Sequence, residues 1–381
     1  MFAWFSLKSG IRGEADYLSQ VDALRGWAIL LVFLFHAWGI AGGQADESSD
    51  SLWFSFVAAG RTGVTLFFVI SGFLLSLPWL RTQQSPGAPM PNLKHYYTAR
   101  VLRIVPLYYA AVLLACLFSG SWGVGFKALT FQFVGFDIFP FSVVWWTLVT
   151  EVQFYLLLPL LMWLLLSGNI GRVLLALILL IWFSLYVAMV LNHSPEENLR
   201  SYFLTKSLFG RLPAFLIGIF AAWIYLRAED LTVFRSQKAN MLSACTVMAA
   251  LASIAFILRQ TLILGEWQSE SGWHIHHTYE ALLWSLVLLA FTLTRPVLGG
   301  VVSNAPMSVV GKLSYSLYLW HVPILFYLIY PVKTDMGAAY LGSHWAYLLT
   351  ILALVLSLAG SLLSYKYIEL PGLELKRRLT V

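Results

Sequence analysis

The chain has 381 residues, of which 59% are hydrophobic and 11% carry a formal charge, and its mean hydropathy is +0.76. Soluble domains are about one-quarter charged, so this composition excludes a water-soluble globular protein. The formal net charge of +6 does not indicate nucleic-acid binding, because basic residues of membrane proteins collect on the cytoplasmic side.

Apolar stretches recur along almost the whole chain, and each is about as long as the ~20 residues that a helix needs to cross a bilayer. The sequence therefore predicts an all-α polytopic membrane protein with about ten transmembrane helices. The N-terminal segment lacks the features of a cleaved signal peptide, so the first span is expected to serve as the insertion signal. The predicted spans are 22–42, 62–80, 103–119, 145–166, 173–191, 208–226, 239–258, 279–294, 311–330 and 345–367.

The basic residues predict the orientation of these spans. If the N-terminus is cytoplasmic, most of the 24 lysines and arginines fall on the cytoplasmic side, which favours both termini inside. The longest polar insertion, residues 81–100, is rich in Pro and Gly and is expected to be irregular. Because no insertion is long enough for a separate domain, residues 1–381 are predicted to form a single transmembrane domain.

Residues 24–37, LRGWAILLVFLFHA, place an arginine and a histidine in an apolar run with no other ionisable side chain. Eleven helical steps separate Arg25 from His36 by about 16 Å and return them to nearly the same helix face. This arrangement suits an anion site at the cytoplasmic end and a base near mid-membrane. Alternatively, Arg25 anchors the helix end and His36 makes a packing hydrogen bond.

The segment WWTLVTEVQFYLLLPLL, residues 145–161, carries Glu151 inside a span that enters from the outer side. A carboxyl at this depth must be paired or neutral. If this span neighbours the first, Glu151 meets His36 from the opposite face and orients the imidazole as a base. Equally, Glu151 is an interfacial carboxylate in headgroup water beside Trp145 and Trp146.

Arg100 and Arg103 lie one turn apart at the cytoplasmic start of the predicted third span. Two guanidinium groups at positions i and i+3 share a helix face and suit a phosphate-rich ligand. Taken alone, this stretch favours ordinary anchoring by positive charge on the cytoplasmic side.

Residues 311–325, GKLSYSLYLWHVPIL, place several polar side chains within the predicted ninth span. His321 followed by Pro323 favours a kink that lines a cavity, although core hydrogen bonding explains His321 equally well. The polar and aromatic side chains of interest here are Ser314, Tyr315, Tyr318, Trp320 and His321.

The sequence predicts no metal site and no soluble-enzyme motif. The segment WHIHH, residues 273–277, is expected in a solvated outer loop and lacks the companion carboxylate or cysteine of a metal site. Cys116 and Cys245 lie in apolar spans, which favours small buried thiols over a disulfide. The chain has no G-x-S-x-G elbow, H-E-x-x-H motif or Walker loop, which disfavours a soluble hydrolase or an ATPase.

Six segments in chain order resemble motifs of the acyltransferase-3 family of integral membrane acyltransferases, and the likeness covers nearly the whole chain. Arg25 and His36 match its first-span pattern, and GVTLFFVISGFLLS is similar to its second-span motif, with Thr65 where that family commonly has aspartate. Position 65 is therefore expected to carry no charge role. The other four segments are ARVLRIVPLYY, WWTLVTEVQFYLLLP with Glu151, GKLSYSLYLWHVPI, and LSYKYIELP with Glu369.

The resemblance implies a stand-alone O-acyltransferase without the C-terminal hydrolase-like domain that some members carry. It implies transfer of an acyl group, by family default acetyl, from cytoplasmic acyl-CoA to a hydroxyl of a carbohydrate or glycolipid. The acceptor would lie at the outer face of a bacterial cytoplasmic membrane. Acyl-CoA is then a co-substrate, and no permanently bound cofactor or metal is implied. By likeness, His36 is the catalytic base, and the contacts to CoA phosphates are Arg25, Arg100 and Arg103.

Residues and resemblance together predict one mechanism. CoA phosphates bind among the arginines, and the pantetheine arm reaches about 16 Å inward to present the thioester to His36. His36 accepts the proton of the acceptor hydroxyl while Glu151 orients or stabilises the imidazolium. The main alternative is a non-enzymatic transporter or flippase for glycans or lipid-linked sugars, and the sequence indicates no oligomeric state. Candidates for binding the substrate or its oxyanion are Ser314, Tyr315, Tyr318 and His321.

Overall fold

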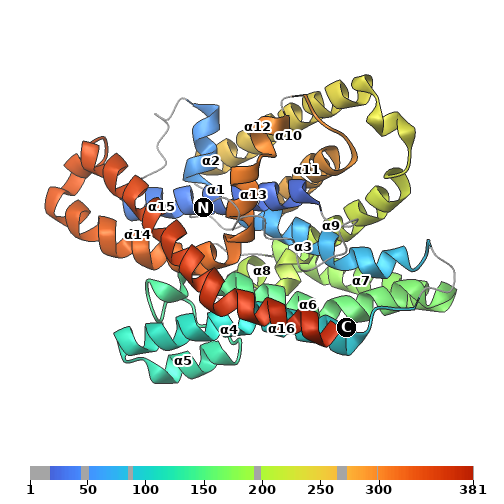
Figure 1. The fold of residues 1–381 in the computed structure, drawn as a ribbon, viewed down its shortest axis with the longest axis horizontal. Helices are drawn as coiled ribbons and strands as arrows, with labels where there is room; N and C mark the ends of the chain where they lie inside the picture. Colours follow the sequence, from blue (N-terminus) through green and yellow to red (C-terminus); the bar gives the residue numbers. More distant parts are fainter. Residues whose placement is uncertain are drawn as a thin grey trace. The chain divides into compact units, whose positions relative to one another are not determined.

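The computed structural model describes residues 18–43, 51–84, 89–192, 199–263, 273–297 and 299–380. Over these residues every regular element is a helix, as the composition predicts, because a helix satisfies its own backbone groups in hydrocarbon. Within the same residues, nine helical stretches are long and apolar enough to cross a membrane. The chain is therefore an all-α integral membrane protein (Figure 1).

The nine stretches found in the described part of the chain coincide with nine of the predicted spans. The remaining prediction, residues 279–294, falls on α11 (Trp273–Leu293), a continuous helix that is not among the nine. The prediction of an outer loop at WHIHH is wrong, because these residues form the first turns of α11. His277 is buried there, and its Nε2 lies 3.0 Å from the carbonyl oxygen of Gly210.

The start of α4 (Leu93–Ser119) also differs from the prediction. The helix begins ten residues before the predicted third span, so the end of the 81–100 insertion is helical rather than irregular. Asn92 caps this start, because its side chain accepts the backbone N–H of His95 at 3.0 Å. Arg100 and Arg103 therefore lie inside a helix and share a face, as their spacing predicts.

Packing divides the chain into two compact units, each assembled from separated segments. The first unit takes its residues from Met1–Gln44, Asn92–Trp146 and Gly300–Val381, and the second from Ala45–Pro91 and Thr147–Gly299. Every candidate residue except Glu151 belongs to the first unit.

The helices of the first unit come from both ends of the chain and from its early middle. α1 packs closely against α13 and along α14, and α14 lies beside α15 (Figure 1). α14 continues through Pro323 without a break. The elements of this unit are α1 (Ser19–Ile40), α4, α5 (Trp122–Leu129), η4 (Phe141–Val144), α13 (Ala305–Lys312), α14 (Ser314–Met336), η6 (Gly337–Tyr340), α15 (His344–Ser364), η7 (Tyr365–Glu369) and α16 (Leu370–Thr380).

Two glycines allow α1 and α13 to approach backbone to backbone. A Cβ atom on Gly26 would lie 2.3 Å from the carbonyl oxygen of Met307, and one on Gly311 would lie 1.7 Å from that of Asp22. These distances leave no room for any side chain, so both positions require glycine, as at close contacts between membrane helices generally. The contact lies one residue from Arg25 and thereby holds the start of α1 in register.

The second unit has the same kind of helix contact. α3 packs closely against α9, and a Cβ atom on Gly72 or Gly218 would lie 2.2 Å from a carbonyl oxygen of the facing helix. α6 begins at the end of a first-unit segment and α12 at the end of a second-unit segment. The elements of the second unit are η3 (Leu52–Phe54), α2 (Ser55–Ala58), α3 (Thr62–Arg81), α6 (Trp145–Leu166), α7 (Gly168–Leu191), α8 (Leu199–Lys206), α9 (Leu208–Ala228), η5 (Thr232–Arg235), α10 (Gln237–Ile263) and α11. Only the first residue of α12 (Gly299–Val302) belongs to the second unit.

Candidate active site

The first candidate feature is α1, which holds both Arg25 and His36. The helix is unbroken between them, so the predicted separation of about 16 Å along one face applies. Both side chains are half-buried, whereas Val32 and Phe33 between them are fully packed. The two polar groups therefore sit at different depths on the same helix.

His36 meets a second histidine, His321 of α14. His36 Nδ1 lies 3.1 Å from His321 Nε2, and the ring centroids are 5.0 Å apart in an edge-on arrangement. His36 Nδ1 also lies 2.9 Å from the carbonyl oxygen of Val32. Within the described residues, every hydrogen bond of the His36 ring involves Nδ1.

His321 has no exposed surface. Its Nδ1 lies 3.0 Å from the carbonyl oxygen of Leu317 and 2.9 Å from that of Tyr318. The ring of Phe33 packs nearby, with its centroid 6.3 Å from that of His321. His321 is thus locked to its own helix on one side and faces His36 on the other.

Arg25 lies against the start of α14. Its Nη2 donates to the Ser314 hydroxyl at 3.0 Å. Since Arg25 meets Ser314 and His36 meets His321, α1 and α14 run in the same direction. This parallel course agrees with the prediction that both spans enter from the same side of the membrane.

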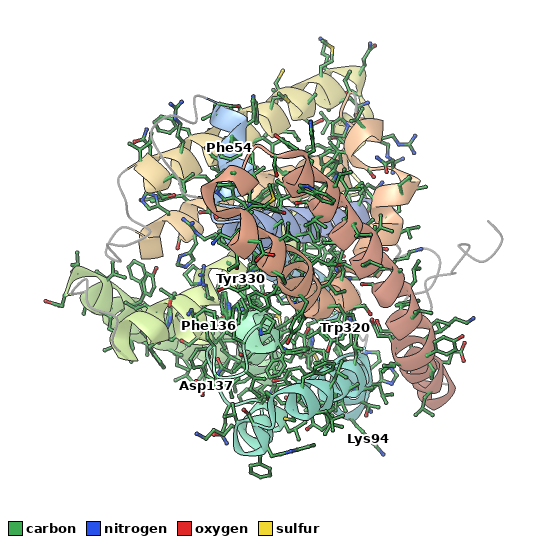
Figure 2. The ribbon with its side chains drawn as sticks, turned by 90° about the vertical axis from the view of Figure 1, so that its left-hand side faces the viewer. Phe54, Lys94, Phe136, Asp137, Trp320 and Tyr330 are labelled. Atoms are coloured by element: carbon green, nitrogen blue, oxygen red, sulfur yellow. The ribbon has the colours of Figure 1, made fainter. Side chains whose placement is uncertain are left out.

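Glu369 is a buried carboxylate near Arg25, and it is 4% exposed. It ends η7, a π-helical segment, and such bulges occur frequently at functional sites. Ser316 donates to Glu369, Ser364 donates to Ser316 at 3.0 Å, and the Trp320 indole donates to Ser364 at 3.1 Å. This chain of hydrogen bonds joins α14, α15 and η7, and Figure 2 labels Trp320 of α14.

Arg103 of α4 comes to the same carboxylate. Glu369 interacts electrostatically with both Arg103 and Arg25. Tyr365 of η7 interacts with Glu369, Arg103 and Asp22. The guanidinium group of Arg100, one turn before Arg103, lies over the Tyr96 ring at 5.2 Å from its centroid. The structure therefore gathers arginines of α1 and α4 around one buried carboxylate of the last span.

The four candidates of α14 separate into different surroundings. Ser314 lies with Arg25, about 10 Å before His321 along the helix axis. Tyr315 donates its hydroxyl to the carbonyl oxygen of Ile104 at 2.7 Å. Tyr318 packs beside His321, with ring centroids 5.8 Å apart. Tyr318 and His321 are thus the α14 candidates that lie nearest to His36.

Glu151 lies in the part of α6 that belongs to the second unit. Its Oε1 accepts the Ser71 hydroxyl of α3 at 2.9 Å. Ser71 falls within the GVTLFFVISGFLLS segment, so two of the motif segments meet here. The orientation of His36 by Glu151 stays a prediction.

A second charged cluster, not predicted as a site, lies inside the second unit. Glu280 of α11 is 3% exposed and interacts electrostatically with Arg61 and with Arg211, which is 5% exposed. The Thr65 hydroxyl donates to Glu280 Oε2 at 3.4 Å, and Arg211 Nε donates to the carbonyl oxygen of Thr205 at 2.7 Å. Thus a carboxylate from α11 lies beside the position where the second-span motif commonly has its own acid.

The signal for this cluster was present in the sequence, because Arg211 and Glu280 both fall inside predicted spans. An ionisable residue within a span is a functional hypothesis by default. The partners were not predictable, since residues 61, 211 and 280 are far apart along the chain. The sequence indicates Glu369 only as part of a motif, because Arg25 and Arg103 are also far from it along the chain.

The predicted cysteine environments are half right. Cys116 is buried and Cys245 is exposed, and both are free thiols. Cys245 shares an exposed face of α10 with Met241 and Met248, which lie one helical turn before and after it. Among the described residues, no group of three His, Cys, Asp or Glu side chains is placed to hold a metal ion.

Comparison with known proteins identifies relatives of this chain. O-acetyltransferase OatA from Staphylococcus aureus strain NCTC 8325 / PS 47 is 23% identical over 384 residues, which cover 93% of this chain and 57% of the relative. OatA from strains COL and MRSA252 aligns with the same figures. The chain therefore spans little more than half the length of these relatives. No solved structure matches it.

A family model also matches this chain. The model of the acyltransferase domain named Acyl_transf_3 matches residues 18–366, which is nearly the whole chain. The chain belongs to the acyltransferase-3 family.

Proposed function

We propose that the protein is a membrane-bound O-acyltransferase. It moves an acyl group, by family default acetyl, from cytoplasmic acyl-CoA to a hydroxyl of a carbohydrate or glycolipid at the outer face of a bacterial cytoplasmic membrane. The observation that carries the proposal is α1, which places His36 and Arg25 on one face about 16 Å apart. The O-acetyltransferase names of the relatives support the reaction class.

The arginine group supplies the donor end of the proposed site. Arg25 and Arg103 lie around Glu369, and Arg100 precedes Arg103 by one helical turn. We propose that these guanidinium groups bind the CoA phosphates through charge-assisted hydrogen bonds. Arginine suits this task because its planar fork binds phosphate oxygens through two parallel hydrogen bonds.

His36 supplies the chemistry. It accepts the proton of the acceptor hydroxyl as that oxygen attacks the thioester carbonyl carbon. The C–S bond then breaks, the new ester leaves, and the imidazolium returns the proton to the CoA thiolate. Glu151 is the proposed stabiliser of the imidazolium, and Tyr318 is the proposed oxyanion donor on α14, since it packs beside His321.

The reaction is tested in inside-out membrane vesicles that contain the protein and receive acetyl-CoA labelled in the acetyl group. We expect CoA thiol to be released together with an equal amount of base-labile label in the glycan or glycolipid fraction. Vesicles without the protein are the control. Glycan movement without thiol release would favour the transporter and overturn the enzymatic proposal.

The donor site yields a separate prediction. Replacing Arg103 by Gln removes a charge-assisted hydrogen bond worth about 1.5–3 kcal/mol. We therefore expect the KM for acetyl-CoA to rise about 10- to 100-fold, while kcat changes little. Lys94, exposed near the start of α4 and labelled in Figure 2, provides the matched control, and Lys94→Gln should leave KM unchanged. An unchanged KM in Arg103→Gln would remove Arg103 from the donor site.

A further inference from the structure

The His36–His321 pair carries an inference about which nitrogen of His36 reacts. His321 Nδ1 faces the carbonyl oxygens of Leu317 and Tyr318 at 3.0 and 2.9 Å. A carbonyl oxygen only accepts hydrogen bonds, so His321 Nδ1 must carry a hydrogen. The state of His321 Nε2 then depends on the group that it faces, which is His36 Nδ1.

His36 Nδ1 is fixed by the same argument. It lies 2.9 Å from the Val32 carbonyl oxygen, so it too must carry a hydrogen. If His321 Nε2 also carried one, two N–H groups would face each other across 3.1 Å. His321 Nε2 therefore holds a lone pair and accepts from His36 Nδ1, which divides its hydrogen between two acceptors.

The consequence for His36 is a single tautomer. With Nδ1 protonated, the neutral ring has its lone pair on Nε2, and within the described residues no hydrogen bond of the ring involves that atom. His36 is half-buried whereas His321 is fully buried, so His36 is the ring with surface left for a substrate. His36 Nε2 therefore has the lone pair that a general base needs to accept a proton.

We propose that His321 is the positioning residue of the acyltransferase reaction: it orients the His36 ring and, together with the Val32 carbonyl, favours the tautomer whose Nε2 accepts the acceptor's proton. This inference rests on the proposed function. His321 does not touch the reacting atoms. His321 Nε2 accepts the hydrogen bond from His36 Nδ1 at every stage of the reaction. When His36 becomes an imidazolium, the lone pair of His321 Nε2 stabilises the positive charge, as the buried carboxylate does in a serine-protease triad.

Two polar variants of His321 distinguish a role in positioning His36 from a role in helix packing alone. His321→Asn keeps an N–H near the carbonyl oxygens of Leu317 and Tyr318 but is too short to reach His36. His321→Gln places an amide oxygen near the former Nε2 and restores the acceptor. We expect kcat to fall about 10- to 100-fold in the Asn variant, less than the loss seen when a triad carboxylate is replaced, because Val32 still holds the tautomer. The Gln variant should stay within a few-fold of the parent, and KM for acetyl-CoA should not change in either.

The parent chain and His36→Ala are assayed alongside, with thermal unfolding of each variant in detergent as a check of folding. If the parent releases no CoA thiol, the proposed function fails and this inference with it. If the parent is active and His36→Ala is not, the activities of His321→Asn and His321→Gln decide whether the inference holds. An Asn variant as active as the parent, or a Gln variant as slow as the Asn variant, overturns the positioning role and leaves the proposed function intact.

Discussion

Replacing His36 with alanine is expected to slow acyl transfer by about 100- to 10,000-fold, the range that a positioned general base contributes. The effect should appear in kcat, because the base acts on the acceptor's proton in the transition state and not on donor binding. The arginine group lies about 16 Å away along α1, so the affinity for acetyl-CoA should remain. Rates of CoA thiol release at saturating acetyl-CoA measure the loss.

Leu34 offers a matched control on the same helix. It is 37% exposed and lies two positions before His36, so Leu34→Ala changes α1 without touching the polar pair. Removing the His36 side chain takes the donor away from the buried His321 Nε2, at a cost of about 1–3 kcal/mol, and the variant should still insert and fold. If His36→Ala keeps the parent rate while Leu34→Ala behaves normally, another group takes the proton and His36 is structural.

The separation of Arg25 and His36 could be predicted because it depends on helix geometry alone. Once the apolar run indicates one unbroken helix, the rise and twist per residue place both side chains. The partner of His36 could not be predicted in this way. His321 was one of several polar residues in its span, and only the packing of α14 against α1 brings its ring to His36.

Helix ends were the weakest part of the sequence-based prediction, for a physical reason. Hydropathy marks where a helix enters hydrocarbon, whereas the helix itself ends where its backbone groups find a cap. α4 thus starts at the Asn92 cap and carries Arg100 inside a helix rather than at its mouth. The same difference explains why WHIHH, polar in character, forms the start of α11.

For the buried carboxylates, the sequence did not predict which residues are their partners. Glu280 lies inside a predicted span and Glu369 lies just past the end of one, and a single carboxylate at either position signals only that a partner exists. Each partner set comes from other segments: Arg61 and Arg211 in the second unit, Arg25 and Arg103 in the first. Such a set requires the fold, because no local pattern in the chain relates these positions.

The largest loss of stability is expected from Glu280→Leu. Removing one partner of a buried ion pair leaves an uncompensated charge and typically costs about 3–5 kcal/mol. Here the guanidinium groups that would lose Glu280 are those of Arg211, which is 5% exposed, and of Arg61. The midpoint of thermal unfolding in detergent, followed by tryptophan fluorescence, should fall well below that of Asp230→Ala, which removes an exposed acid of the same unit.

A second substitution distinguishes the lost ion pair from lost packing. Arg211→Met in the Glu280→Leu background removes a buried cation and replaces it with an apolar side chain, which in buried ion pairs is often neutral or stabilising by about 1–4 kcal/mol. The double variant should therefore unfold at a higher temperature than Glu280→Leu alone. If instead the two losses simply add, the cost arises from the shape of the Glu280 side chain and not from its charge, because independent sites add while coupled charges do not. A rescued double variant that still transfers acetyl groups would further assign the cluster to folding rather than to the reaction.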